Sequence, residues 1–338
     1  MSEVVFPLLG TVFVVLAVLP ASALLAKLLL LILDRSSGSA LHGLEVRYLI
    51  LICSTALPLA WFLSAGLHQA ETGQSVVACL FNHSSEGCLE PVLFASTLLL
   101  VMAGLSSNTF RRSCGVALIS SPRSHQLQDR IEAILRTTPW LDPLQCRVAF
   151  TDTLEFALGT QGLLSPQVVV GIAYAEATSD EALAAALGHE AEHLRSRDPL
   201  RYLLLALALA MNPFGRWLLG PDARRWLAAR EAHCDREAVV RGAAPLFLAE
   251  ALVQAARPEP MPRVGLGAQD ASMLKLRVGL LLAYAEQSPV HCCRREPSTI
   301  SVALSLLCLF LFLPHQTSTA ALDVLHAGAE RAHSFFWN

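Results

Sequence analysis

The chain has 338 residues, of which 54% are hydrophobic and only 16% are charged, whereas about a quarter of the residues in a soluble globular domain carry a charge. This composition and a mean hydropathy of +0.48 are typical of a membrane protein, so the lipid bilayer is an expected partner. The net charge of −3 argues against direct nucleic-acid binding, which needs a strong basic excess on one face.

Four apolar runs approach the length of about 20 residues that a helix needs to cross a bilayer. They are residues 4–26, 47–66, 91–107 and 298–314. The first run has no basic segment before it and continues to Asp34-Arg35, so it is interpreted as a retained anchor rather than a signal peptide. We therefore expect a mainly α-helical multi-pass membrane protein. Its three-helix membrane region would occupy residues 1–110, and a short C-terminal tail, 315–338, would follow the last transmembrane helix.

The orientation follows from the distribution of Lys and Arg among the short loops, because cytoplasmic loops carry the excess. Arg35 and Arg47 flank the first loop, the loop over residues 67–90 has neither residue type, and Arg111 follows the third span. The chain is therefore expected in the cell membrane with both termini outside. The domain over residues 111–297 would face the cytoplasm.

Cys79 and Cys88 flank a short polar stretch in the loop expected outside the cell. An oxidising compartment would allow them to form a disulfide. The sequence leaves open whether they pair.

Three short runs upstream of the main polar motif have the β-branched and aromatic character of strands. They are Arg147 to Phe150, Leu154 to Leu158 and Gln167 to Val170. Turn-prone residues separate them, so the sequence predicts a small sheet. An exposed edge of such a sheet can take up a substrate in extended form as an added strand.

Residues 180–197 read DEALAAALGHEAEHLRSR, which is rich in strong helix formers. Thr178 with Glu181 fits a capping box at the start, and Pro199 marks the end. In this helix His189 and His193 are one turn apart on one face, with Glu190 beside them. A catalytic zinc requires two such nitrogen ligands, a nearby carboxylate outside the ligand set and an open position for water. The alternative is a surface helix that carries His and Glu by chance.

A further apolar run over residues 200–220 is interrupted by Asn212-Pro213. Proline in a helix interior removes a hydrogen bond and clashes with the preceding turn, so we expect a helical hairpin over residues 200–230. A single crossing would place Glu231 on the opposite side of the membrane from His189, and one metal site could not include both.

The next predicted helix contains Glu231 and Asp235 and ends near Gly242, a plausible C-cap. The two carboxylates lie on one face at i, i+4, where like charges repel, and a metal ion beneath them would explain the arrangement. Asp235 and Asp198 are candidates to accept the other N–H of a ligating histidine. The alternatives are a solvated surface residue for Asp235 and a simple helix end for Asp198.

Three segments together carry a family resemblance: His189-Glu190-Ala-Glu-His193-Leu-Arg-Ser-Arg-Asp198-Pro, Asn212-Pro213-Phe214 and Arg230-Glu231-x-x-Cys234-Asp235. In these segments the chain resembles the gluzincin-like membrane metallopeptidases of the BlaR/MecR type, which transduce β-lactam signals. The resemblance covers roughly residues 110–290. It implies a small α+β zincin-like metalloprotease domain, in which His189, His193 and Glu231 bind Zn²⁺ and Glu190 is the general base.

The same resemblance implies a zinc-dependent endopeptidase that hydrolyses a cytoplasmic regulatory protein, such as a transcriptional repressor, in signal transduction. The chain departs from the family because its C-terminal tail is far too short for the penicillin-binding sensor domain. One alternative is a membrane quality-control protease of the HtpX or Ste type, which shares the H-E-x-x-H pattern. The other is a non-catalytic membrane signalling scaffold, for which Glu190 would have no use.

Overall fold

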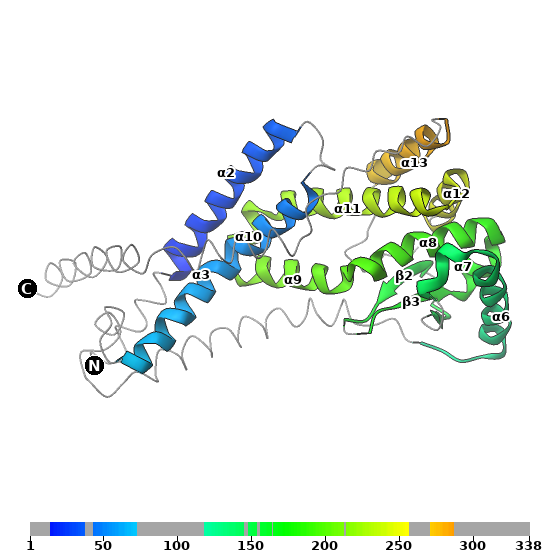
Figure 1. Ribbon diagram of the computed structural model, residues 1–338, viewed down its shortest axis with the longest axis horizontal. Coiled ribbons are helices and arrows are strands. Elements are labelled where there is room, and N and C mark those ends of the chain that lie inside the picture. The colour runs from blue at the N-terminus through cyan, green and yellow to red at the C-terminus, as the bar shows by residue number, and fades with distance from the viewer. Residues whose placement is uncertain are drawn as a thin grey trace, which may run out of the picture. The chain divides into compact units, whose positions relative to one another are not determined.

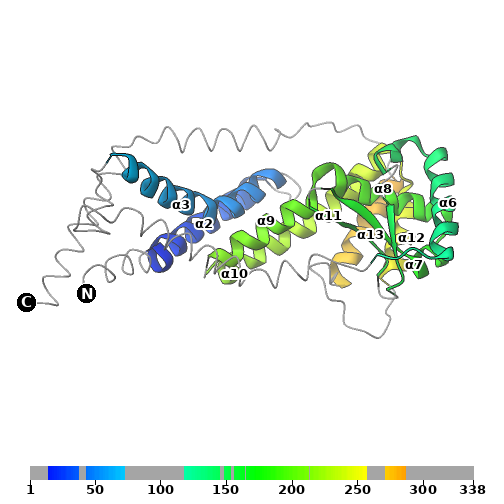
Figure 2. The ribbon, with the colours of Figure 1, turned by 90° about the horizontal axis from the view of Figure 1, so that it is seen from below.

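The computed structural model describes residues 14–37, 43–72, 118–144, 148–153, 156–163, 165–212, 214–256 and 271–286 (Figures 1 and 2). The chain forms two compact units. The first, here the helical unit, comprises Met1–Ser106, Leu205–Arg224 and Arg295–Asn338. The second, here the sheet unit, comprises Ser107–Leu204 and Arg225–Arg294. Most described residues are helical, and a small three-stranded sheet accompanies them.

The helical unit contains one helix that is long and apolar enough to cross a membrane, as far as the described residues extend. This candidate span, Leu16–Arg35, comprises the end of η1 (Val14–Val18) and most of α2 (Leu19–Ser37). The predicted run over residues 47–66 lies within α3 (Leu44–Thr72).

Several predicted features lie outside the described residues, and the structure does not describe them. They are the spans at 91–107 and 298–314, the loop with Cys79 and Cys88, and the tail over residues 315–338.

The apolar run over residues 200–220 is broken at Asn212. Helix α9 (Asp198–Met211) precedes this break, and α10 (Gly215–Leu218) and α11 (Gly220–Arg241) follow it. Asn212 Oδ1 accepts a hydrogen bond from the Phe214 N–H at 3.1 Å, and Asn212 Nδ2 donates to the Leu19 carbonyl at 2.9 Å. A polar side chain therefore closes the turn and ties it to the first turn of α2.

A buried ion pair adds a second connection within the helical unit. Lys27 Nζ on α2 lies 2.6 Å from Asp222 Oδ2 in the first turn of α11, where only 7% of the Asp222 side chain is exposed. A buried charge is retained at low cost only when it is paired, and Lys27 supplies such a pairing for Asp222.

The sheet unit is built on three short strands, β1 (Val148–Thr151), β2 (Leu158–Gln161) and β3 (Gln167–Gly171). Their order is β1-β3-β2, with β3 parallel to β1 and antiparallel to β2. The helices of this unit are α6 (Pro122–Thr137), η2 (Pro139–Leu144), α7 (Ile172–Ala177), α8 (Asp180–Ser196), α12 (Pro245–Ala255), α13 (Ala271–Glu286), the start of α9 and most of α11.

The second strand begins later than the run over residues 154–158 predicts. It occupies Leu158–Gln161, where Leu158 faces Val170 and Gln161 faces Gln167. The connection from β2 to β3 is a tight one that begins at Gly162, whose φ of +99° is a conformation that few other residues adopt. The turn therefore fixes the register of β2 against β3. The apolar residues before β2 do not fix it.

The core of the sheet unit lies between the sheet and helices α6 and α8. Val168, Val169 and Val170 of the central strand are completely buried, which agrees with a strand covered on both faces. Leu183 and Leu187 of α8 pack into the same cluster as Val168 and Val170. This packing holds α8 against the sheet and fixes where its polar face points.

The residue that caps the start of α8 differs from the predicted one. Ser179 is the N-cap and accepts a hydrogen bond from the Ala182 N–H at 3.3 Å, whereas the Thr178 hydroxyl donates to the Tyr174 carbonyl of α7 at 2.6 Å. Thr178 thus closes the preceding helix. At the other end Arg197 adopts a left-handed conformation with φ of 52° and ends α8.

A glycine in α8 allows close packing against an aromatic ring. A Cβ at Gly188 would lie 2.2 Å from a ring carbon of Trp140, whereas a Cβ at Gly279 in α13 would meet nothing within 4 Å. Overpacking a core costs about 1–3 kcal/mol, so Gly188→Ala should lower the thermal unfolding temperature. Gly279→Ala should stabilise its helix by roughly 0.5–1 kcal/mol. Circular dichroism during heating measures both variants, and equal shifts would contradict the packing described.

Candidate metal centre

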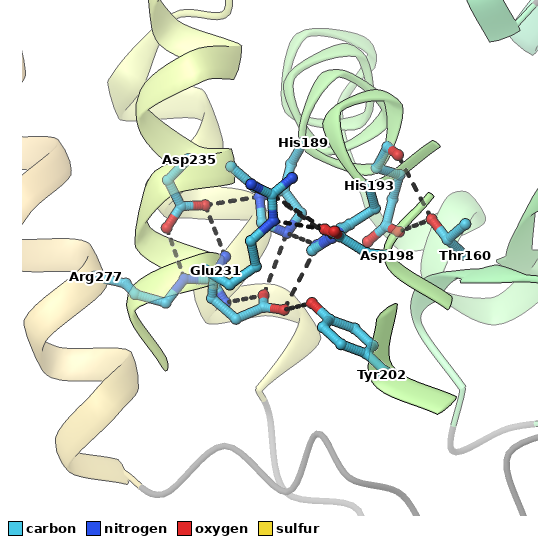
Figure 3. Close-up of polar contacts among 11 residues, drawn as sticks. Thr160, His189, His193, Asp198, Tyr202, Glu231, Asp235 and Arg277 are labelled. Carbon is cyan, nitrogen blue, oxygen red and sulfur yellow. Dashed lines mark hydrogen bonds and ion pairs between the residues drawn. The ribbon is translucent and has the colours of Figure 1, made fainter. Parts of the chain in front are cut away.

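The two histidines of the H-E-x-x-H segment lie side by side on α8 (Figure 3). Their Nε2 atoms are 3.1 Å apart, and each residue is 6% exposed. Because both side chains arise from one rigid helix one turn apart, the geometry of α8 brings them to the same face. The pair therefore forms a preorganised nitrogen donor set.

The Glu231 carboxylate, on α11, completes a donor triangle with these two nitrogens, one carboxylate oxygen facing each of them (Figure 3). Its Oε2 lies 3.4 Å from His189 Nε2, and its Oε1 lies 3.5 Å from His193 Nε2. Tetrahedral zinc with bonds of about 2.0–2.1 Å to nitrogen and oxygen places its ligands about 3.3–3.4 Å apart. The chemistry and the spacing of these three residues therefore fit a zinc ion.

Glu190 lies beside this triangle and faces the sheet. The Thr160 hydroxyl of β2 donates a hydrogen bond to Glu190 Oε2 at 2.6 Å, and Glu190 is 7% exposed. A donor atom of Glu190 also lies within 4.8 Å of donor atoms of both histidines. Glu190 is thus close enough to act on a molecule bound between the histidines, and the Thr160 hydroxyl holds its carboxylate.

A second group of possible ligands, His193, Asp198 and Cys234, lies on the other side of the His193 ring. Here His193 Nδ1 is only 2.6 Å from Asp198 Oδ2, which is a hydrogen-bond distance and shorter than the separation of two ligands on one ion. Cys234 Sγ is 3.6 Å from the same nitrogen. The Nδ1 side of His193 is therefore a hydrogen-bonding side, and the Nε2 side is left for a metal.

The hydrogen bond from His193 continues to a buried arginine. Arg230 Nε donates to Asp198 Oδ2 at 2.8 Å, and the Asp198 side chain is completely buried. Burial acts to raise the pKa of Asp198, but the hydrogen bond and charge of His193 and the charge of Arg230 together hold it below its ordinary value. Asp198 is therefore an ionised acceptor that fixes the His193 ring.

His189 has a corresponding carboxylate and arginine. Asp235 Oδ1 lies 2.9 Å from His189 Nδ1, although the two do not meet with hydrogen-bond geometry. Arg277 of α13 binds Asp235 through both oxygens, at 2.6 and 2.7 Å. Burial acts to raise the pKa of Asp235, but the His189 charge and the Arg277 hydrogen bonds outweigh it and lower the pKa.

Arg277 also contacts the third donor of the triangle. Its Nη1 lies 3.1 Å from Glu231 Oε2, and the arginine is only 1% exposed. The pKa of Glu231 is held below its ordinary value, because the charges of His193 and Arg277 and the His189 hydrogen bond outweigh the effect of burial. The repulsion expected between Glu231 and Asp235 is therefore relieved by Arg277 even without a metal.

The predicted site residues thus meet in one place. His189, Glu190, His193, Asp198, Glu231 and Asp235 all lie in this cluster.

Four further residues of the cluster were not among the predicted site residues. Arg277 is a lone arginine among apolar residues of α13, and that is a signal of a buried charge with a partner. Tyr202 stands one turn after Asp198 on α9 and donates to Glu231 Oε1 at 3.4 Å. Thr160 carries no signal in the sequence, and Arg230 was part of the motif that carries the family resemblance.

The contact of Asp198 with His193 predicts that Asp198 contributes to zinc binding, and a substitution tests this. Removing the carboxylate partner of a ligating histidine typically costs 10–100-fold in metal affinity, so Asp198→Asn should weaken zinc binding by roughly that factor. Competition with a chelator of known affinity measures it. Asp152→Asn, at an exposed position in the same unit, is the matched control, and an equal effect of both changes would contradict the role of Asp198.

Comparisons with known proteins give no relative from which a role can be transferred: no family model, no curated protein and no solved structure matches the chain. The functional argument therefore depends on the geometry around His189, His193 and Glu231.

Proposed function

We propose that the chain is a zinc-dependent membrane endopeptidase. The observation that supports this most strongly is the triangle of His189 Nε2, His193 Nε2 and the Glu231 carboxylate, with edges of 3.1, 3.4 and 3.5 Å. A zinc site with three protein ligands and a fourth position for water is the arrangement found in catalytic zinc centres.

The residues around the triangle supply the remaining chemistry of peptide hydrolysis. Zinc, when bound, acts as a Lewis acid that acidifies water and polarises a carbonyl group. Glu190 is the general base: its carboxylate takes a proton from the attacking water and returns it to the leaving amine. Asp198 fixes the His193 ring through a hydrogen bond, and Asp235 lies beside His189 Nδ1 at 2.9 Å. The reaction needs no covalent intermediate.

Strand β2 is proposed as the substrate-binding edge. Among the described residues it pairs with β3 alone, because the strand order is β1-β3-β2, and its Thr160 touches Glu190. A peptide that adds to the free edge of β2 in extended form would pass beside the base. A flexible or locally unfolded segment of a protein is the substrate that can do so.

The setting of this reaction is proposed from the candidate span and the basic residues. The span Leu16–Arg35, together with the predicted spans, favours a multi-pass protein of the cell membrane with the metal centre in the cytoplasm and both termini outside. The resemblance to BlaR/MecR-type peptidases favours a cytoplasmic regulatory protein, such as a repressor, as the substrate. A metal centre that maps outside the cell by site-directed labelling would refute this substrate class.

The experiment that tests the proposed activity combines metal content with hydrolysis of a quenched fluorescent casein by the detergent-purified protein. We expect zinc and a signal that a chelator abolishes and added zinc restores. Zinc-loaded protein without any hydrolysis of casein or of co-purified cytoplasmic proteins would favour the signalling scaffold. Substrate capture with the Glu190→Gln variant then separates a regulatory protease from a quality-control protease, because the latter retains many misfolded proteins.

A further inference from the structure

Thr160 contacts Glu190 through its hydroxyl and not only through packing. Its Oγ1 lies 2.6 Å from Glu190 Oε2 and 3.5 Å from the Glu190 backbone oxygen. A hydroxyl has one proton to donate, and 2.6 Å is the length of a charge-assisted O–H···O⁻ bond. The hydroxyl proton therefore goes to the carboxylate.

The sheet holds this hydroxyl in a defined position. Thr160 faces Val168 in the register of β2 and β3, and Val168 is completely buried in the core against α8. The donor and the acceptor thus come from two rigid elements that pack on one another, and neither depends on a loop. Groups that sit on such elements are positioned more precisely than groups on loops.

One oxygen of Glu190 is therefore occupied, and the carboxylate cannot rotate freely about its last bond. We propose that Thr160 is a positioning residue, which fixes the Glu190 carboxylate so that Oε1 is the oxygen left to exchange protons with a molecule at the metal. This inference rests on the proposed function. The ordinary alternative is that Thr160 is a β-branched strand residue whose hydroxyl is incidental.

The test uses Thr160→Val, which keeps the shape of the side chain and removes the donor, beside Thr160→Ser, which keeps the donor. Thr151→Val is the matched control, because Thr151 lies in β1 of the same sheet and its hydroxyl pairs with Thr153. Each full-length protein is loaded with Co²⁺, and its visible absorption is titrated with acetohydroxamate, which releases a proton as it chelates the metal. Glu190 is the neighbouring group that can receive this proton.

We expect all variants to bind one cobalt ion, and Thr160→Val to bind acetohydroxamate about tenfold more weakly, because a carboxylate that is free to rotate no longer presents Oε1 to the released proton. Thr160→Ser and Thr151→Val should bind it as the wild type does. In a Glu190→Gln background, Thr160→Val should have no further effect. With casein as substrate, the same change should lower kcat about tenfold and leave KM unchanged.

Unchanged or tighter acetohydroxamate binding in Thr160→Val, or an equal loss in the Glu190→Gln background, would overturn the positioning role while the proposed function stands. Wild-type protein that binds no cobalt would instead refute the proposed function, and the role of Thr160 with it. These two failures are therefore distinguishable.

Discussion

Glu190→Gln is expected to reduce peptide hydrolysis by roughly 10²–10⁴-fold, the contribution of a positioned general base, while the zinc content stays at the wild-type level. The amide keeps the size of the side chain but cannot accept the proton of water. Because the donor triangle consists of His189, His193 and Glu231, with edges of 3.1 to 3.5 Å, the loss of the Glu190 charge should leave the metal in place. Casein hydrolysis and elemental mass spectrometry of the same preparation measure the two quantities.

The matched control for this change is Glu181→Gln, an exposed glutamate in the first turn of the same helix. It should leave both activity and zinc unchanged. Full activity in Glu190→Gln would contradict the role of Glu190 as the base. Loss of zinc from Glu190→Gln would instead place Glu190 among the ligands.

His193→Ala is expected to abolish stoichiometric zinc and, with it, all hydrolysis. The change removes one of three donors, so it should cost far more than the roughly 10–100-fold loss expected when only a hydrogen-bond partner of a ligand is removed. It also removes the histidine partner of the buried Asp198, which keeps Arg230 and Cys234 as neighbours, and some loss of stability should accompany the loss of metal. Metal analysis and thermal unfolding measure the two effects.

His125→Ala tests whether any histidine would give this result, since His125 is exposed on α6. That variant should retain zinc, activity and stability. If His193→Ala kept its full zinc content, the metal would have to be bound elsewhere in the chain.

The parts of the site that the sequence could predict are those that depend on local geometry. His189, Glu190 and His193 share one helix, so their spacing alone places them on one face, and α8 has nearly the predicted bounds. Glu231 and Asp235 share α11 in the same way. No local rule predicts that α8 and α11 meet. The sequence indicated this contact only through the family resemblance and through the break at Asn212.

The parts that the sequence could not predict depend on contacts between distant segments. Arg277 meets Asp235 and Glu231 across 42 and 46 residues, and Thr160 meets Glu190 across 30. The predicted start of β2 was wrong because the turn at Gly162 and the pairing with β3 set the register of this strand. The capping box was wrong because Thr178 bonds to the helix before it.

The most direct test of the zinc centre is the zinc content of the full-length protein, purified in detergent without added metal and analysed by elemental mass spectrometry. The geometry of His189, His193 and Glu231 predicts about one zinc ion per chain, removed by a chelator and taken up again on addition of zinc. Well-folded protein that holds no zinc and takes up none would contradict the metal centre. The H-E-x-x-H segment would then be no more than the polar face of α8.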